Sequence, residues 1–280
     1  METPTIPTGA PLVMRQLGAM LGLELRKTFL RLRALPVVVI AFLPATLALL
    51  RLAGSELGSM RPTPAAEMAL SYANLFQFFF LRLVVFFVAF AVFTYLVRGE
   101  TAERSLHFYL LAPLDRSVFL LGKYLAGLLG AGALVLASLA VQLLLLFLPA
   151  ATTGGGAYLF GGPGAGHAAA YAAVSLLAVA GYGAVFTALA LVVRNPMLPA
   201  AAILGWEWVN PFLPSLLQKA SVIHHLQALC PLPVARGPWA LPAEPTAAPL
   251  AIVSLLALAG LLLVLAARRA RRLEVRYAGD

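Results

Sequence analysis

The chain has 280 residues, of which 61% are hydrophobic and only 11% are charged, whereas soluble domains carry about 25% charged residues. So few charges cannot cover a water-facing surface, so the composition excludes a soluble globular protein and indicates one whose outer surface faces lipid. The net charge of +9 does not indicate a nucleic-acid binder, because the basic residues lie between apolar runs and form no single patch. Cys230 is the only cysteine, which excludes an intrachain disulfide.

The first 34 residues are interpreted as a cytoplasmic segment. We expect an amphipathic helix over residues 12–33 that lies in the inner membrane interface, with its basic side chains toward anionic head groups. A cleaved signal peptide is the alternative, because an apolar run follows and ends in the sequence Arg-Leu-Ala-Gly-Ser. The long segment before that run disfavours cleavage, since the charged start of a signal peptide is short.

Six apolar stretches are candidates for membrane spans, because one crossing takes about 20 apolar residues. We expect a single all-α membrane domain over residues 35–275, with spans near residues 35–52, 75–97, 118–148, 167–193, 196–210 and 249–267. Prolines break the chain after the fifth span, so we expect a short re-entrant helix near residues 212–229 before the last span. A basic tail follows at residues 268–280.

The basic residues between the spans set the orientation, because cytoplasmic loops of membrane proteins carry an excess of Lys and Arg. Fifteen Lys and Arg residues fall on one side, and Arg82 lies inside a span. The other side has four, which are Arg51, Arg61, Lys219 and Arg236. Both termini are therefore expected in the cytoplasm, and six crossings satisfy that parity.

No pattern in the chain predicts catalysis. The glycine-rich outer loop 149–166 lacks the Lys of a phosphate-binding loop and is expected to be a flexible connection. Gly122, Lys123 and Tyr124 mimic half of such a loop, but Tyr124 stands where a metal-binding Ser or Thr is needed. The sequence also lacks the zinc and nucleophile motifs of common hydrolases. We therefore expect no enzyme activity and no cofactor in this chain.

The connection between the second and third spans, residues 98–123, begins with mixed charges and then turns apolar as far as Pro113. A short amphipathic helix held between two spans has two interpretations. It lies on lipid head groups, or it docks in a groove of a partner protein. The pattern of residues by itself leaves both interpretations open.

At this connection the sequence resembles the membrane subunits of type-2 ATP-binding cassette (ABC) exporters, which are permeases driven by a separate ATPase subunit. The resemblance is carried by Glu100, Glu103, Arg104, Ser105, Leu106, Leu110, Pro113, Leu114, Arg116, Gly122 and Lys123. It implies a coupling helix near residues 100–112 that contacts the ATPase. The contact residues that it implies are Glu100, Glu103, Arg104, Ser105, Leu106, Phe108, Leu110, Leu111, Pro113 and Arg116.

The resemblance also implies partners and a location. Two permeases, identical or different, would assemble with two ATPase subunits that bind ATP and Mg²⁺, in the plasma (inner) membrane of a prokaryote. A substrate that the sequence does not identify would be exported between the permeases. The alternative is a membrane subunit that transmits force to an extracytoplasmic partner without transport. An intramembrane enzyme is a third class, but it needs clustered polar residues at one depth.

Two charged residues fall within predicted spans. Glu207 lies near the middle of the fifth span, where an unpaired carboxylate costs about 2.5–3.5 kcal/mol. Arg82 lies in the second span, and its side chain is long enough to reach the same depth. We expect the two side chains to pair between helices, or Glu207 to line the substrate path. His224 and His225 are adjacent and cannot clamp a metal together, so we expect them to be solvated at the outer face.

Overall fold

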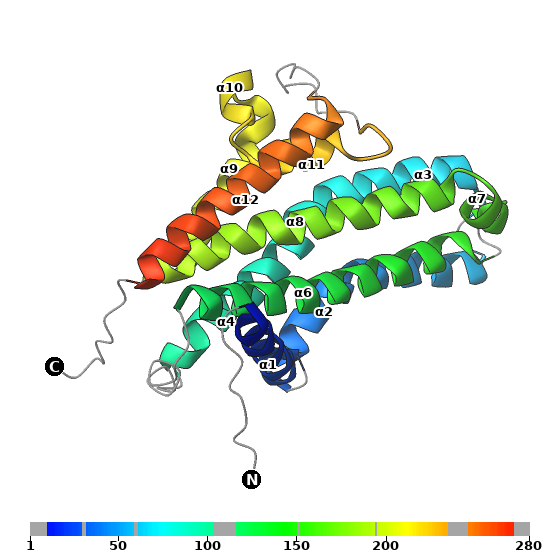
Figure 1. Ribbon diagram of the computed structural model, residues 1–280. Coiled ribbons are helices and arrows are strands. Elements are labelled where there is room, and N and C mark those ends of the chain that lie inside the picture. The colour runs from blue at the N-terminus through cyan, green and yellow to red at the C-terminus, as the bar shows by residue number, and fades with distance from the viewer. Residues whose placement is uncertain are drawn as a thin grey trace, which may run out of the picture.

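The computed structural model describes residues 10–29, 32–58, 61–102, 116–149, 152–193, 195–234 and 246–271. Over these residues the chain is mostly helical, and its long helices pack side by side (Figure 1). The elements in chain order are α1 (Ala10–Phe29), η1 (Leu32–Ala34), α2 (Leu35–Glu56), β1 (Thr63–Pro64), α3 (Ala65–Asn74), η2 (Leu75–Val85), α4 (Phe86–Ala102), α6 (Arg116–Phe147), β2 (Thr152–Thr153), α7 (Gly155–Gly161), α8 (Gly164–Val192), α9 (Met197–Val209), η3 (Asn210–Phe212), α10 (Ser215–Gln218), α11 (Val222–Ala228) and α12 (Ala248–Arg271).

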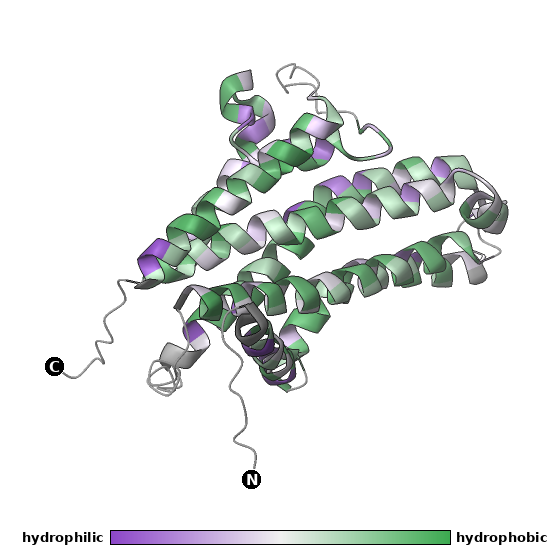
Figure 2. Cartoon of the chain, viewed as in Figure 1, coloured by the Kyte–Doolittle hydropathy of each residue, from purple (hydrophilic) through white to green (hydrophobic). Residues whose placement is uncertain are grey.

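Five helical stretches among the described residues are long and apolar enough to cross a membrane. They are Leu35–Ser55, Ala65–Gly99, Ser117–Phe147, Gly164–Val192 and Ala248–Ala270. Figure 2 shows apolar residues along α2, α6, α8 and α12, and many of their large apolar side chains are exposed. A surface of this kind is stable against lipid rather than against water. The structure thus has the form expected of an all-α, multi-pass membrane protein.

Four of the predicted spans correspond to single long helices, α2, α6, α8 and α12. The second span starts earlier than expected, because α3, η2 and α4 form one continuous helix from Ala65 to Ala102. Pro64 precedes that helix, and its first residues are good helix formers. The fifth predicted span, residues 196–210, contains only α9, whose 13 residues rise about 20 Å, less than the roughly 30 Å of a hydrocarbon core.

The core of the bundle is aromatic where α4 packs on α8. Phe86 lies edge to face with Tyr182 and Phe186 of α8, with ring centroids 5.4 Å and 5.0 Å apart. Farther along α4, the buried ring of Phe93 lies directly against Gly183. These aromatic residues of the second span therefore serve helix packing.

Gly183→Ala is expected to destabilise the bundle by about 1–3 kcal/mol through overpacking. A Cβ atom at Gly183 would lie 2.4 Å from the Phe93 ring, which is buried in the core. The melting temperature of the purified protein measures the effect. Gly260→Ala in α12 is the matched control, because no atom lies within 4 Å of its Cβ position. A Gly183→Ala variant that Phe93→Leu does not rescue would contradict this contact.

One pair of short strands ties two loops together at one end of the bundle, shown on the right in Figure 1. β1 and β2 pair in parallel, with Thr63 opposite Thr152. Arg51 of α2 donates a hydrogen bond from Nη2 to Oγ1 of Thr63 over 2.6 Å. The hydroxyl of Thr152 donates to the main-chain oxygen of Leu146 near the end of α6. The loop before α3 and the loop after α6 are thus joined to each other and to their own helices.

The connection between α6 and α8 contains a helix, so the expectation of a flexible outer loop is wrong for its described part. The ring of Tyr158 in α7 stacks on Phe147 with centroids 5.1 Å apart. A hydrogen bond of 2.6 Å joins Tyr158 Oη to His167 Nδ1 of α8. Burial raises the pKa of Tyr158 above its ordinary value of 10.0, so the phenol stays neutral near pH 7. Apolar residues between the glycines give α7 a face that packs on its neighbours.

Candidate functional site

The predicted coupling segment falls largely outside the described residues, which end at 102 and resume at 116. The residues named for it that lie outside are Glu103, Arg104, Ser105, Leu106, Phe108, Leu110, Leu111 and Pro113. Glu100 lies in the last turn of α4, and Arg116 is the first residue of α6. The structure therefore describes α4 and α6, the two helices on either side of this segment, and the candidate site lies where they meet α1.

Lys123 connects three helices next to the predicted coupling segment. Its Nζ lies 2.9 Å from Oε1 of Glu24 in α1 and donates a second hydrogen bond of 2.6 Å to the main-chain oxygen of Leu96 in α4. The side chains of Lys123 and Glu24 are each only 2% exposed. Charge-assisted hydrogen bonds are strong when they are shielded from water. We call Glu24, Leu96 and Lys123 the Lys123 junction.

The start of α6 also packs closely on α1 beside this junction. A Cβ atom at Gly122 would lie 3.2 Å from Cβ of Met20, closer than side chains normally approach. Lys123 Nζ in addition lies 4.9 Å from the ring centroid of Phe119, a cation–π contact. In the sequence, Gly122 and Lys123 stood out as part of the family resemblance and as half of a phosphate-binding loop, and in the structure they hold α1 against α6. Glu24 was not singled out in the sequence, although it is the one acidic residue of α1.

Glu207 of α9 is the centre of a second buried polar site. Its side chain is 2% exposed, and its carboxylate accepts hydrogen bonds of 3.2 Å from the main-chain nitrogens of Val222 and Ile223. The hydroxyl of Ser221 donates to the same carboxylate. The N–H groups at a helix start have no partner within the helix, and an acidic side chain satisfies them well. Glu207 therefore fastens α9 to the first turn of α11.

Arg82 lies beside Glu207, and the direct pairing of the two side chains stays a prediction. It belongs to η2, which is a π-helix, and it is 2% exposed. Its Nη1 donates a hydrogen bond of 3.2 Å to the main-chain oxygen of Glu207. The guanidinium carbon lies 5.4 Å and 5.5 Å from the ring centroids of Phe78 and Trp208. These contacts attach η2 to α9 through the backbone of α9.

Buried amides extend this polar site and were not identified from the sequence. Asn210 donates from Nδ2 to the main-chain oxygen of Gln218 over 3.1 Å, and Gln218 donates from Nε2 to the main-chain oxygen of Leu213 over 2.8 Å. Gln77 of η2 donates to the main-chain oxygen of Leu232 over 2.9 Å. These bonds satisfy backbone groups where the chain is irregular, which is what buried non-helical backbone requires.

The expectation that His224 and His225 are solvated is wrong, since they are only 4% and 6% exposed. Both belong to α11, which packs against α8, α12 and η2. A hydrogen bond of 3.2 Å joins Nε2 of His224 to Oγ1 of Thr246. Within the described ranges, no group of three or more His, Cys, Asp or Glu residues is placed to hold a metal ion.

No protein-family model and no curated protein matches this chain. The features of the chain that bear on function are the contacts of the two buried sites and the residues around the predicted coupling segment. Of these, the Lys123 junction has the more specific position, because it joins helices on both sides of that segment.

Proposed function

We propose that this protein is the permease subunit of a type-2 ABC exporter, which moves a substrate across the plasma membrane of a prokaryote. A separate ATPase subunit would supply the energy and bind ATP and Mg²⁺. The observation that carries the proposal is the Lys123 junction, in which the buried ammonium of Lys123 in α6 bonds to α1 and to α4. A displacement of the segment between α4 and α6 moves the membrane helices only if the end of α4 and the start of α6 are held together, and Lys123 bonds to α4 at this place.

The proposal includes six crossings with both termini in the cytoplasm and a re-entrant segment before the last crossing. Figure 1 supports it, because α8 and α12 lie side by side and run in the same direction. Two neighbouring spans with the same direction require the chain between them to return across the membrane. α9 would make most of that return, and the short helices η3, α10 and α11 would form the re-entrant segment within the cover of η2, α8 and α12.

The assembly we propose has two permeases and two ATPase subunits, with the substrate path between the permeases. The coupling helix, near residues 100–112, would lie in a groove of the ATPase. Closure of the ATPase dimer around ATP would move this helix and, through the Lys123 junction, the cytoplasmic ends of α1, α4 and α6. Arg82 and Glu207 lie away from that junction and are assigned to holding η2, α9 and α11 together.

Leu106→Asp, Phe108→Asp and Leu110→Asp are each expected to abolish copurification of the ATPase subunit with this chain. An ionised carboxylate in an apolar groove loses its hydration without gaining a partner, and a central contact residue typically contributes 2 kcal/mol or more, which is roughly thirtyfold in affinity. The measurement is the amount of ATPase that copurifies with tagged permease from membranes that contain both subunits.

Phe160→Asp is the matched control for these variants, because Phe160 in α7 is an exposed aromatic residue at the opposite end of the bundle. The control variant should retain the ATPase. Retention of the ATPase by all three coupling-segment variants would contradict the proposal. Labelling of a cysteine at position 103 from the extracytoplasmic side, in a Cys230→Ser background, would contradict it as well.

A further inference from the structure

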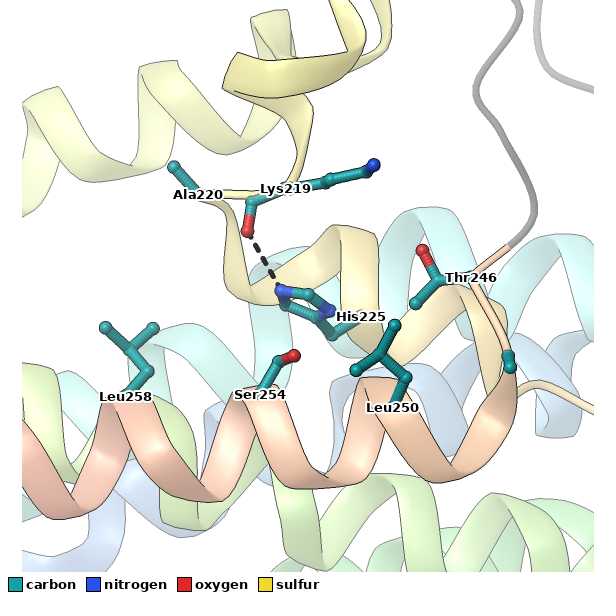
Figure 3. A pocket seen from close by; sticks show the side chains of 8 residues that line it. Lys219, Ala220, His225, Thr246, Leu250, Ser254 and Leu258 are labelled. Carbon is teal, nitrogen blue, oxygen red and sulfur yellow. Dashed lines mark hydrogen bonds between the residues drawn. The ribbon is translucent and has the colours of Figure 1, made fainter.

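A pocket of about 570 Å³ lies between the turn that follows α10, the short helix α11 and the first half of α12 (Figure 3). Its volume is in the range of pockets that bind small molecules. The lining residues on which the argument depends are Lys219, His225, Thr246, Leu250, Ser254 and Leu258. None of them belongs to the Lys123 junction or to the hydrogen bonds around Glu207.

His225 supplies a buried polar atom that lacks a hydrogen-bond partner among the described residues. Its Nε2 lies 2.9 Å from the main-chain oxygen of Lys219, and because a carbonyl oxygen can only accept, Nε2 carries the hydrogen. In the neutral ring Nδ1 is then an acceptor. Nδ1 is buried without a partner, although His225 is 6% exposed, and in Figure 3 it faces the side of Leu250 and Thr246. Buried polar atoms nearly always have a partner, so a hydroxyl of a ligand suits this place.

Two hydroxyls and one ammonium add to the polar part of the pocket. Lys219 extends from the loop above the pocket. Thr246 lies at the edge of the pocket, just before α12, and Ser254 lies on α12 (Figure 3). An ammonium and hydroxyl donors together favour a phosphate group. The acceptor Nδ1 of His225, in contrast, favours a hydroxyl. A ligand that satisfies both carries a phosphate and a hydroxyl group near each other.

The other wall of the pocket is apolar and continuous with the outer surface of α12. Leu250 is 58% exposed, and Leu258 lines the pocket two turns farther along α12. Beside them, the side chains of Val253, Leu256 and Leu261 are exposed on the same helix. A water-soluble ligand would leave this wall uncovered, whereas an acyl chain would lie along it and continue into the surrounding lipid.

We propose that this pocket binds an anionic phospholipid whose head group carries a hydroxyl, with phosphatidylglycerol as the simplest example. The phosphate would lie near Lys219 and Thr246, the head-group hydroxyl would donate to Nδ1 of His225, and one acyl chain would lie along Leu250 and Leu258. This site requires no ATPase and no transported substrate, so it stands apart from the proposed exporter function.

Native mass spectrometry of the purified full-length chain in detergent tests the proposal by titration with phosphatidylglycerol, phosphatidylcholine and glycerol 3-phosphate. The wild-type chain is expected to bind phosphatidylglycerol at least about tenfold more tightly than phosphatidylcholine, since a charge-assisted hydrogen bond contributes about that factor or more. Lys219→Gln should remove this preference, and Lys219→Arg should keep it. Arg61→Gln is the control, because Arg61 is an exposed cation that does not line the pocket.

Ser254→Leu serves if Lys219→Gln fails to fold, because it fills the pocket and leaves the charge of Lys219 in place. It should also weaken binding of phosphatidylglycerol. Equal binding of phosphatidylglycerol and phosphatidylcholine by the wild-type chain would overturn the proposal. Displacement of phosphatidylglycerol by glycerol 3-phosphate at equal concentration would overturn it too, because the ligand would then be a soluble phosphate rather than a lipid.

Discussion

Lys123→Met is expected to lower the free energy of unfolding by about 3–5 kcal/mol, the usual result of removing one partner from a buried ion pair. The substitution leaves the carboxylate of Glu24 in α1 and the main-chain oxygen of Leu96 without their ammonium donor. Methionine fills most of the volume, so the loss reports the charge rather than a cavity. The melting temperature of the purified chain in a fixed detergent measures it.

Two further variants separate the buried charge from other effects of this substitution. Glu24→Leu combined with Lys123→Met should recover most of the stability, because no buried charge is then left unpaired. Arg26→Met is the matched control, since Arg26 also belongs to α1 but is exposed, and such substitutions usually change stability by about 0.5 kcal/mol or less. A Lys123→Met variant as stable as Arg26→Met would show that the pair contributes nothing.

Glu207→Leu, like Lys123→Met, is expected to have a large effect and to lower the free energy of unfolding by about 3 kcal/mol or more. It removes the acceptor of two main-chain nitrogens, at Val222 and Ile223, and of the Ser221 hydroxyl. Each buried donor left without an acceptor costs about 1–3 kcal/mol. Glu207→Gln keeps one acceptor oxygen and should lose less stability. The melting temperature and the fraction of monodisperse protein measure both variants.

A charge swap tests the role of Arg82 at the same site. Arg82→Glu combined with Glu207→Arg is expected to restore none of the stability lost in the single variants. Arg82 donates to the main-chain oxygen of Glu207, while the carboxylate bonds to the start of α11. A guanidinium in place of Glu207 would meet N–H donors rather than acceptors. Recovery of stability in the swapped variant would show that the two side chains pair directly.

The long helices could be predicted from the sequence because each is an uninterrupted apolar run of the length that a membrane crossing requires. This held for α2, α6, α8 and α12. The helix before Leu75 was missed because α3 contains polar residues such as Glu67 and Asn74. These residues make the segment too polar to be recognised as a membrane span, but they still form helix. α7 was missed because glycine was taken as a sign of flexibility, whereas Tyr158 packs on Phe147 and fixes the segment.

The candidate sites were predictable only in part, because their partners come from distant parts of the chain. Arg82 and Glu207 were identified because a charged residue inside an apolar run can be recognised from the sequence alone. The acceptor of Arg82 is a backbone atom, which no residue pattern marks. Glu24 and Lys123 lie far apart in sequence and meet only because α1 packs on the start of α6. His225 is buried by the packing of α11, which short helices do not reveal in advance.

The paired strands β1 and β2 restrict how the helices can rearrange. They hold the loop before α3 against the loop after α6, and the hydrogen bond from Arg51 to Thr63 attaches α2 to the same contact. If one of these helices slid lengthwise past another, the contact between the two loops would have to break. In the proposed exporter, a displacement at the opposite end, where Lys123 of α6 bonds to α1 and α4, would therefore tilt the helices about this contact and leave their lengthwise register unchanged.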